Sequence, residues 1–145
     1  MNTNSASESQ ADISGSALAE ELRSVGLRPT RQRMALAELL FGQGKRHITA
    51  EALYSEAIAA GVHVSLATVY NALHTFTAKG LLREISLDSS RSYFDTNTVE
   101  HHHFYFEKSG RLEDIDNADV KIGRLPETPD GVPVSRVDVI IRVDG

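Results

Sequence analysis

The spacing of apolar residues changes once along this chain, near Gly80, and this change constrains the fold more than any other feature. Before it, apolar side chains recur every three or four residues, as in amphipathic helices. After it, they alternate every two residues, as in strands. Helices followed by strands, without alternation between the two, are typical of an α+β fold. We therefore expect helices first and β-hairpins second.

Four segments of the first half carry helix start and stop signals. The expected helices run from Ala17 to Val25, from Thr30 to Phe41, between Thr49 and Gly61, and between Ser65 and Gly80. Threonine and serine cap helix N-termini, whereas glycine ends helices. In the fourth helix one apolar stripe is expected, formed by Leu66, Val69, Leu73 and Phe76.

Two short strands, Leu81 to Leu87 and Arg91 to Phe94, are expected to form a hairpin after the fourth helix. Helices followed by such a hairpin predict a winged helix-turn-helix. The fourth helix has a polar face whose side chains have the size to reach base edges and phosphates. This face comprises Thr68, Asn71, His74 and Thr75, with Tyr70 at its edge.

The charge is unevenly distributed. The net charge is −5, yet basic and acidic residues are equal in number from Met1 to Ser86. The whole excess of acidic residues lies after Ser86. Between Arg23 and Arg46 the chain has six basic residues and a single acidic one, Glu38. This stretch therefore has the positive charge that binding to phosphates requires. The basic residues are Arg23, Arg28, Arg31, Arg33, Lys45 and Arg46. The alternative for this basic cluster is a solvated helix face.

The chain contains no cysteine, so imidazole and carboxylate are its only strong metal donors. Disulfides, iron–sulfur clusters and a thiol nucleophile are excluded. No apolar run approaches the ~18 residues that cross a bilayer, and the N-terminus lacks the features of a secretory signal. We therefore expect a cytoplasmic protein without a membrane partner.

The second half predicts a small separate domain. A strand over HHHFYFE, a turn at Lys108 to Gly110, a partner strand over RLEDID, a short helix from Asn117 to Leu125 and a strand from Val134 to Val143 are expected. So few elements can enclose only a small hydrophobic core, and a second copy of the chain could bury the apolar surface that remains exposed. We therefore expect a homodimer.

Three consecutive histidines open this domain. Alternation along a strand would place His101 and His103 on one face and His102 on the other. Glu113, Asp114 and Asp95 could add oxygen donors, and His47, expected at the start of the third helix, could reach the same place. This cluster predicts a transition-metal or haem site. The alternative is a solvent-facing polar strand end.

These motifs together resemble the ferric uptake regulator (Fur) family. The resemblance runs from Ala17 to Val143 and is carried by GLRPTRQR, HITAEALY, SLATVYNALHTFTAKGLL, the SYFD wing, the HHH strand and the last strand. Within the family, the missing cysteine pairs and the FDTNTVEHHHFYFE segment look most like the iron response regulators (Irr) of alphaproteobacteria. The resemblance implies a dimeric transcription factor that controls iron and haem genes.

The resemblance also implies site residues. The family's regulatory metal site falls on His47, Asp95, His101, His103 and Asp114. Glu100 and His102 could retain part of a second metal site, although Val137 stands where that site needs a histidine. Haem would use His101, His102 and His103. The implied cofactor is a divalent metal ion, Mn, Fe or Zn, with haem as another ligand.

The resemblance places DNA binding on the first domain, where Tyr70 matches the family's base-contacting tyrosine and Arg28 a basic residue near the minor groove. With the residues singled out above, the predicted DNA contacts are Arg28, Arg31, Thr68, Tyr70 and Asn71. The partner would be a near-palindromic double-stranded operator.

The domain boundaries follow. We expect a flexible tail over residues 1–15, a winged-helix DNA-binding domain over 16–95, a linker over 96–100 and a dimerisation and sensing domain over 101–145. The function indicated is a DNA-binding transcriptional regulator of iron and haem homeostasis that responds to metal or haem through its histidine-rich site. Its rivals are a peroxide- or zinc-sensing repressor of the same family and, from another class, a small histidine-ligated metalloenzyme that activates water, for which no general base is evident.

Overall fold

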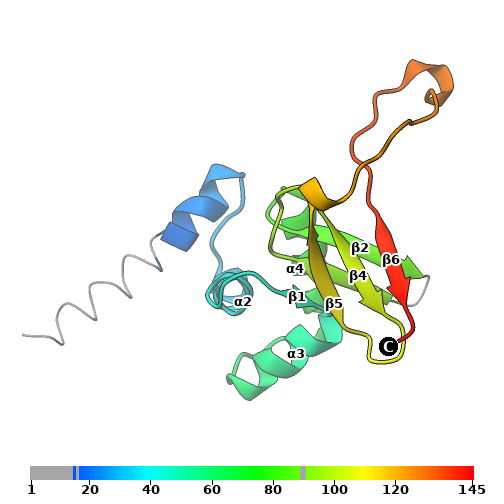
Figure 1. The fold of residues 1–145 in the computed structure, drawn as a ribbon. Coiled ribbons are helices and arrows are strands. Elements are labelled where there is room, and N and C mark those ends of the chain that lie inside the picture. The colour runs from blue at the N-terminus through cyan, green and yellow to red at the C-terminus, as the bar shows by residue number, and fades with distance from the viewer. Residues whose placement is uncertain (1–14, 16, 89–90) are drawn as a thin grey trace, which may run out of the picture. The chain divides into compact units, whose positions relative to one another are not determined.

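The computed structural model describes residues 15, 17–88 and 91–145, so of the expected tail over residues 1–15 only Gly15 is described, and it is helical rather than part of a flexible tail. The chain divides into two compact units, Met1–Thr98 (unit 1) and Val99–Gly145 (unit 2). Unit 1 holds the helices and one small sheet, and unit 2 holds a second sheet (Figure 1).

The helices of unit 1 follow the expected cap signals. Residues 17–24 are helical, and three labelled helices follow: α2 (Arg31–Phe41), α3 (Ala50–Ala59) and α4 (Leu66–Ala78). The side chains of Thr30, Thr49 and Ser65 each accept a backbone N–H near the helix start, at 3.1–3.2 Å. Past α4, Gly80 adopts φ +79°, a left-handed conformation that glycine tolerates best. The four expected helices are confirmed.

The core of unit 1 lies between α2, α3 and α4. Val69, Leu73 and Phe76 of α4 are fully buried. Leu66, expected on the same stripe, is 36% exposed because it occupies the first position of the helix. The buried face of α4 therefore begins at Val69, and its polar face stays outside.

The small sheet of unit 1 has the order β1-β3-β2. The expected hairpin is confirmed as β2 (Arg83–Asp88) and β3 (Arg91–Asp95), although β2 begins two residues later than expected. Strand β1 (His47–Ile48) was not expected, because two residues are too few to show a strand period. It pairs antiparallel with β3, so His47 lies in a strand rather than in the third helix.

The sheet of unit 2 has the order β5-β4-β6. Its strands are β4 (His101–Phe106), β5 (Leu112–Asp116) and β6 (Ile140–Val143), with β4 antiparallel to β5 and parallel to β6. The β4–β5 hairpin is confirmed. Its turn carries Gly110 at φ +74°.

The expected helix and last strand of unit 2 are only partly formed. Helical structure stops after the single turn η1 (Asn117–Asp119), because Gly123 and Pro126 interrupt the segment that would continue it. The last strand starts at Ile140, not Val134, because β4 pairs with it only from His103 to Phe106.

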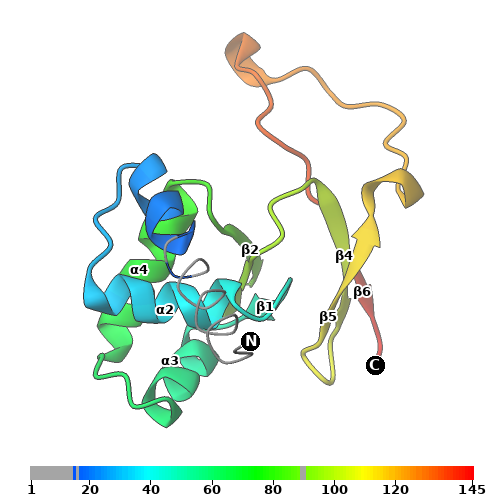
Figure 2. The same cartoon turned by 90° about the vertical axis from the view of Figure 1, so that its left-hand side faces the viewer.

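The segment between η1 and β6 loops away from the sheet of unit 2 and returns through η2 (Pro129–Gly131) (Figure 2). It exposes four large apolar side chains, at 42–59% of their surface: Ile122, Leu125, Val132 and Val134. Unit 2 thus keeps much of its apolar surface outside its own core. Among the described residues, no helix is long and apolar enough to span a bilayer.

Candidate metal centre and DNA-reading face

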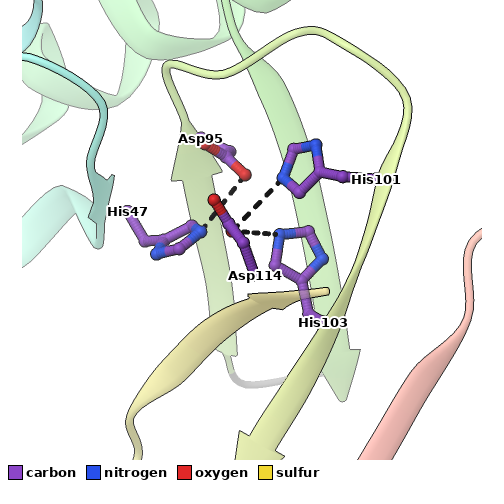
Figure 3. Close-up of side chains that lie close together, drawn as sticks. All are labelled: His47, Asp95, His101, His103 and Asp114. Atoms are coloured by element: carbon purple, nitrogen blue, oxygen red, sulfur yellow. Dashed lines mark ion pairs between the residues drawn. The ribbon is translucent and has the colours of Figure 1, made fainter. Parts of the chain in front are cut away.

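Unit 1 brings His47 and Asp95 together. They are directly paired across β1 and β3, so their side chains share one face of the sheet. His47 Nε2 lies 3.2 Å from Oδ2 of Asp95, a carboxylate that is only 1% exposed (Figure 3). Asp95 Oδ1 also accepts the backbone N–H of Asn97 at 2.9 Å, which orients the carboxylate. This pair offers one imidazole nitrogen and one carboxylate oxygen.

Arg46 holds the start of β1 in place. Its guanidinium binds both carboxylate oxygens of Glu56 in α3, at 3.0 and 2.5 Å, and its backbone N–H donates to Thr96 Oγ1 at 2.9 Å. The Arg46 side chain is 20% exposed and already paired with a carboxylate. Arg46, which the sequence placed in the basic cluster, is therefore paired within unit 1, where it fixes the strand that carries His47.

Unit 2 places His101 and His103 on one face of β4, as the strand alternation predicts. The Nε2 atoms of both rings lie 3.3 Å from the same oxygen, Oδ1 of Asp114 on β5 (Figure 3). One donor atom from each of the three residues lies within 4.8 Å of the others. Nδ1 of His101 is 2.5 Å from the Val99 carbonyl, an acceptor, so Nδ1 donates there and Nε2 is the ring nitrogen turned toward Asp114.

His102 points to the opposite side and has a different role. Its Nδ1 accepts the backbone N–H of Val139 at 3.0 Å, so the hydrogen sits on Nε2, which donates to Asn117 Oδ1 at 3.1 Å. Both ring nitrogens are thereby occupied. Glu100 and Val137 line the adjacent hollow of about 330 Å³, but His102 presents no lone pair to it. In this conformation His102 ties β4 to the segment that leads into β6.

The donors of the two units are chemically matched to transition metals. The predicted set comprises three imidazoles and two carboxylates: His47, Asp95, His101, His103 and Asp114. Nitrogen and oxygen donors without thiolate suit Mn, Fe and Zn.

The predicted DNA contacts lie on the outer surface of unit 1. Arg28, Arg31 and Asn71 are exposed. Thr68 is half-buried, and its hydroxyl lies 2.9 Å from that of Ser65, so it forms part of the helix cap. Asn71 and Thr68 line a hollow of about 260 Å³ between α4 and the start of α2. Basic and amide groups thus remain available on this face.

Tyr70 has a partner that the sequence did not indicate. Its hydroxyl donates to Oε1 of Glu51, at the start of α3, at 2.6 Å. The shared hydrogen bond lowers the pKa of the Glu51 carboxyl and raises the pKa of the Tyr70 phenol. The sequence shows Glu51 only as an acidic first-turn residue. Nineteen positions separate the two, and no periodicity links them.

Comparison with known proteins identifies relatives across most of the chain. The model of the ferric uptake regulator family matches residues 24–135. The peroxide-responsive repressor PerR of Staphylococcus epidermidis is 37% identical over 94 residues, which cover 65% of this chain and 62% of that protein. The ferric uptake regulation protein of Legionella pneumophila is 34% identical over 97 residues, which cover 66% of this chain and 71% of that protein.

Solved structures show the same fold. The ferric uptake regulator of Pseudomonas aeruginosa with manganese superposes with a TM-score of 0.67 at 25% identity, covering 86% of this chain and 94% of that one. The Campylobacter jejuni peroxide stress regulator gives a TM-score of 0.58 at 27% identity, over 90% and 94% of the two chains. The relatives named here are regulators and repressors, not enzymes. By its sequence and its α+β fold, this chain belongs to the ferric uptake regulator family.

Proposed function

We propose that this chain is a metal-responsive transcriptional repressor of iron homeostasis that binds a near-palindromic operator as a homodimer. Unit 1 supplies the helices and basic residues of a winged-helix DNA reader, and unit 2 supplies a histidine-rich sensor. Regulators of both iron uptake and the peroxide response are among its relatives. The exposed apolar residues between η1 and β6 support a second copy as the partner that buries them.

The sensor in this proposal is a single metal site that draws on both units. Unit 1 offers two donors and unit 2 offers three, so neither alone supplies the four ligands of a tetrahedral site or the six of an octahedral one. Only six positions separate Asp95 of unit 1 from His101 of unit 2, so the connecting chain can hold these two ligands no more than about 20 Å apart. A metal bound by both would restrain the angle between the units, which is how occupancy would control DNA binding.

The observation that carries this proposal is the carboxylate of Asp114, which meets both His101 and His103 at 3.3 Å. Asp114→Asn should weaken binding of Mn(II) to the full chain by at least about tenfold and reduce metal-dependent DNA binding. Glu113→Gln is the matched control. The sequence offered Glu113 as a possible donor, but strand alternation along β5 turns it away from Asp114, and it pairs with the exposed Arg111 at 3.3 Å. Calorimetric metal titration and a DNA-binding assay measure the two effects.

Two results would contradict the proposal. One is an Asp114→Asn protein that binds Mn(II) as tightly as the Glu113→Gln protein does. The other is a wild-type protein that selects no duplex from randomised DNA, with or without Mn(II), Fe(II) or Zn(II).

Peroxide sensing is the second candidate, favoured by the 37% identity to a peroxide-responsive repressor. The two functions differ in what releases DNA. A peroxide sensor loaded with Fe(II) should lose its operator when hydrogen peroxide is added, whereas the Mn(II) form should keep it. An iron sensor should release DNA only when the metal is withdrawn. A zinc sensor should bind its operator when Zn(II) is added and should not bind it when Fe(II) is added at the same concentration.

Haem remains a sequence prediction for His101, His102 and His103. His102 uses both ring nitrogens within unit 2, which leaves His101 and His103 as the histidines to test. A His101→Ala and His103→Ala double variant that keeps a stoichiometric low-spin haem spectrum would remove haem from this site. The second metal site at Glu100 and His102 gains no support from these contacts.

A further inference from the structure

Glu51 and Tyr70 form a contact on unit 1 that the proposed metal response does not use. The Tyr70 hydroxyl of α4 donates to the Glu51 carboxylate of α3 at 2.6 Å. Hydrogen bonds to a charged acceptor are stronger than those between neutral groups. The pair lies beside a hollow of about 220 Å³ that also reaches Arg91 and Ser92 of β3, next to the polar face of α4.

The tyrosine ring is held as well as its hydroxyl. It stacks on His74, one turn further along α4, with ring centroids 6.2 Å apart and planes at 21°. The His74 ring in turn meets the buried Phe94 ring edge-on at 5.7 Å. Tyr70 is therefore placed before any ligand arrives, and less ordering is needed on binding.

The hydrogen bond decides which role the hydroxyl can play. The same contact lowers the pKa of Glu51 and raises that of Tyr70, so at neutral pH the carboxylate is charged and the phenol keeps its hydrogen. A tyrosine hydroxyl has one hydrogen to donate, and here it points to Glu51. The oxygen is left only with lone pairs, which accept.

Resting on the proposed DNA-binding function, we propose that Glu51 makes Tyr70 a hydrogen-bond acceptor that reads the exocyclic amino group of adenine or cytosine in the major groove. Those amino groups are the donors that bases expose there. Guanine and thymine expose hydrogen-bond acceptors in the major groove, and phosphate oxygens are acceptors too. A hydroxyl whose one hydrogen already goes to Glu51 has none left to donate to them. Glu51 is thus a positioning residue that determines specificity.

The experiment uses full-length protein loaded with Mn(II) and a duplex selected by it from randomised DNA. Each adenine is replaced in turn by purine without the 6-amino group, and each cytosine by pyrimidin-2-one without the 4-amino group. For wild type, one position in each half-site should weaken binding about fivefold when its amino group is removed. Tyr70→Phe should be insensitive at that position. Glu51→Ala should be less sensitive than wild type, because its free tyrosine hydroxyl can donate to a base acceptor as well as accept from an amino group.

Two further variants separate this role from a merely structural one. Glu51→Gln keeps an oxygen that accepts the tyrosine hydrogen, so it should stay as sensitive as wild type. Glu38→Gln removes a charge from the exposed side of α2 and should leave the base preference unchanged. Thermal melting confirms that each variant is folded.

The inference is overturned if Glu51→Ala is as sensitive to the missing amino group as wild type. It is also overturned if wild type and Tyr70→Phe respond alike at every position. Failure of the wild-type protein to select any duplex is a different result, since it refutes the proposed DNA-binding function itself.

Discussion

At the scale of single residues, neighbouring histidines of β4 have different roles, one in stability and one in the proposed metal site. His102 is bonded to Val139 and Asn117, whereas His103 faces Asp114. His102→Ala leaves a backbone N–H and an amide oxygen without their partner, so we expect it to lower the free energy of unfolding by about 1–3 kcal/mol. His103→Ala should instead weaken Mn(II) binding. Urea unfolding and metal titration on both variants test this, and equal effects on metal affinity would contradict it.

At the scale of elements, strand β1 is too short to hold itself, and Arg46 supplies the missing contacts. Arg46→Met removes a partly exposed ion pair with Glu56 and a donor to the Leu39 carbonyl. We expect a loss of about 1–2 kcal/mol in stability and weaker Mn(II) binding, because His47 is no longer fixed. Lys45→Met, at the exposed neighbouring position, is the control. Unchanged metal affinity in Arg46→Met would show that β1 does not depend on this residue.

At the scale of the whole molecule, the exposed apolar segment of unit 2 and the size of its core predict a dimer. Sedimentation of the full chain at micromolar concentration should give twice the monomer mass of 15.9 kDa.

Two DNA-binding domains related by a two-fold axis need half-sites on one side of the duplex. Inserting about five base pairs between half-sites should therefore abolish binding, and about ten should restore it. A monomer that tolerates both insertions would refute this.

The sequence alone determined the features that depend on neighbouring residues. Thr30, Thr49 and Ser65 marked three helix starts because capping is a contact with the next turn. The alternation within β4 separated His102 from His101 and His103, because side chains on a strand point to alternate faces. Donor types were also evident, since a chain without cysteine can offer only imidazole and carboxylate.

The tertiary structure decided what depends on residues far apart in the chain. Arg46 meets Thr96 across 50 positions, His102 meets Val139 across 37, and Tyr70 meets Glu51 across 19. Arg46 thereby supports β1, His102 ties β4 to the segment before β6, and Tyr70 donates its hydroxyl hydrogen to Glu51. Such roles follow from hydrogen-bond partners that only folding brings within about 3 Å, and no local pattern encodes which partner that will be.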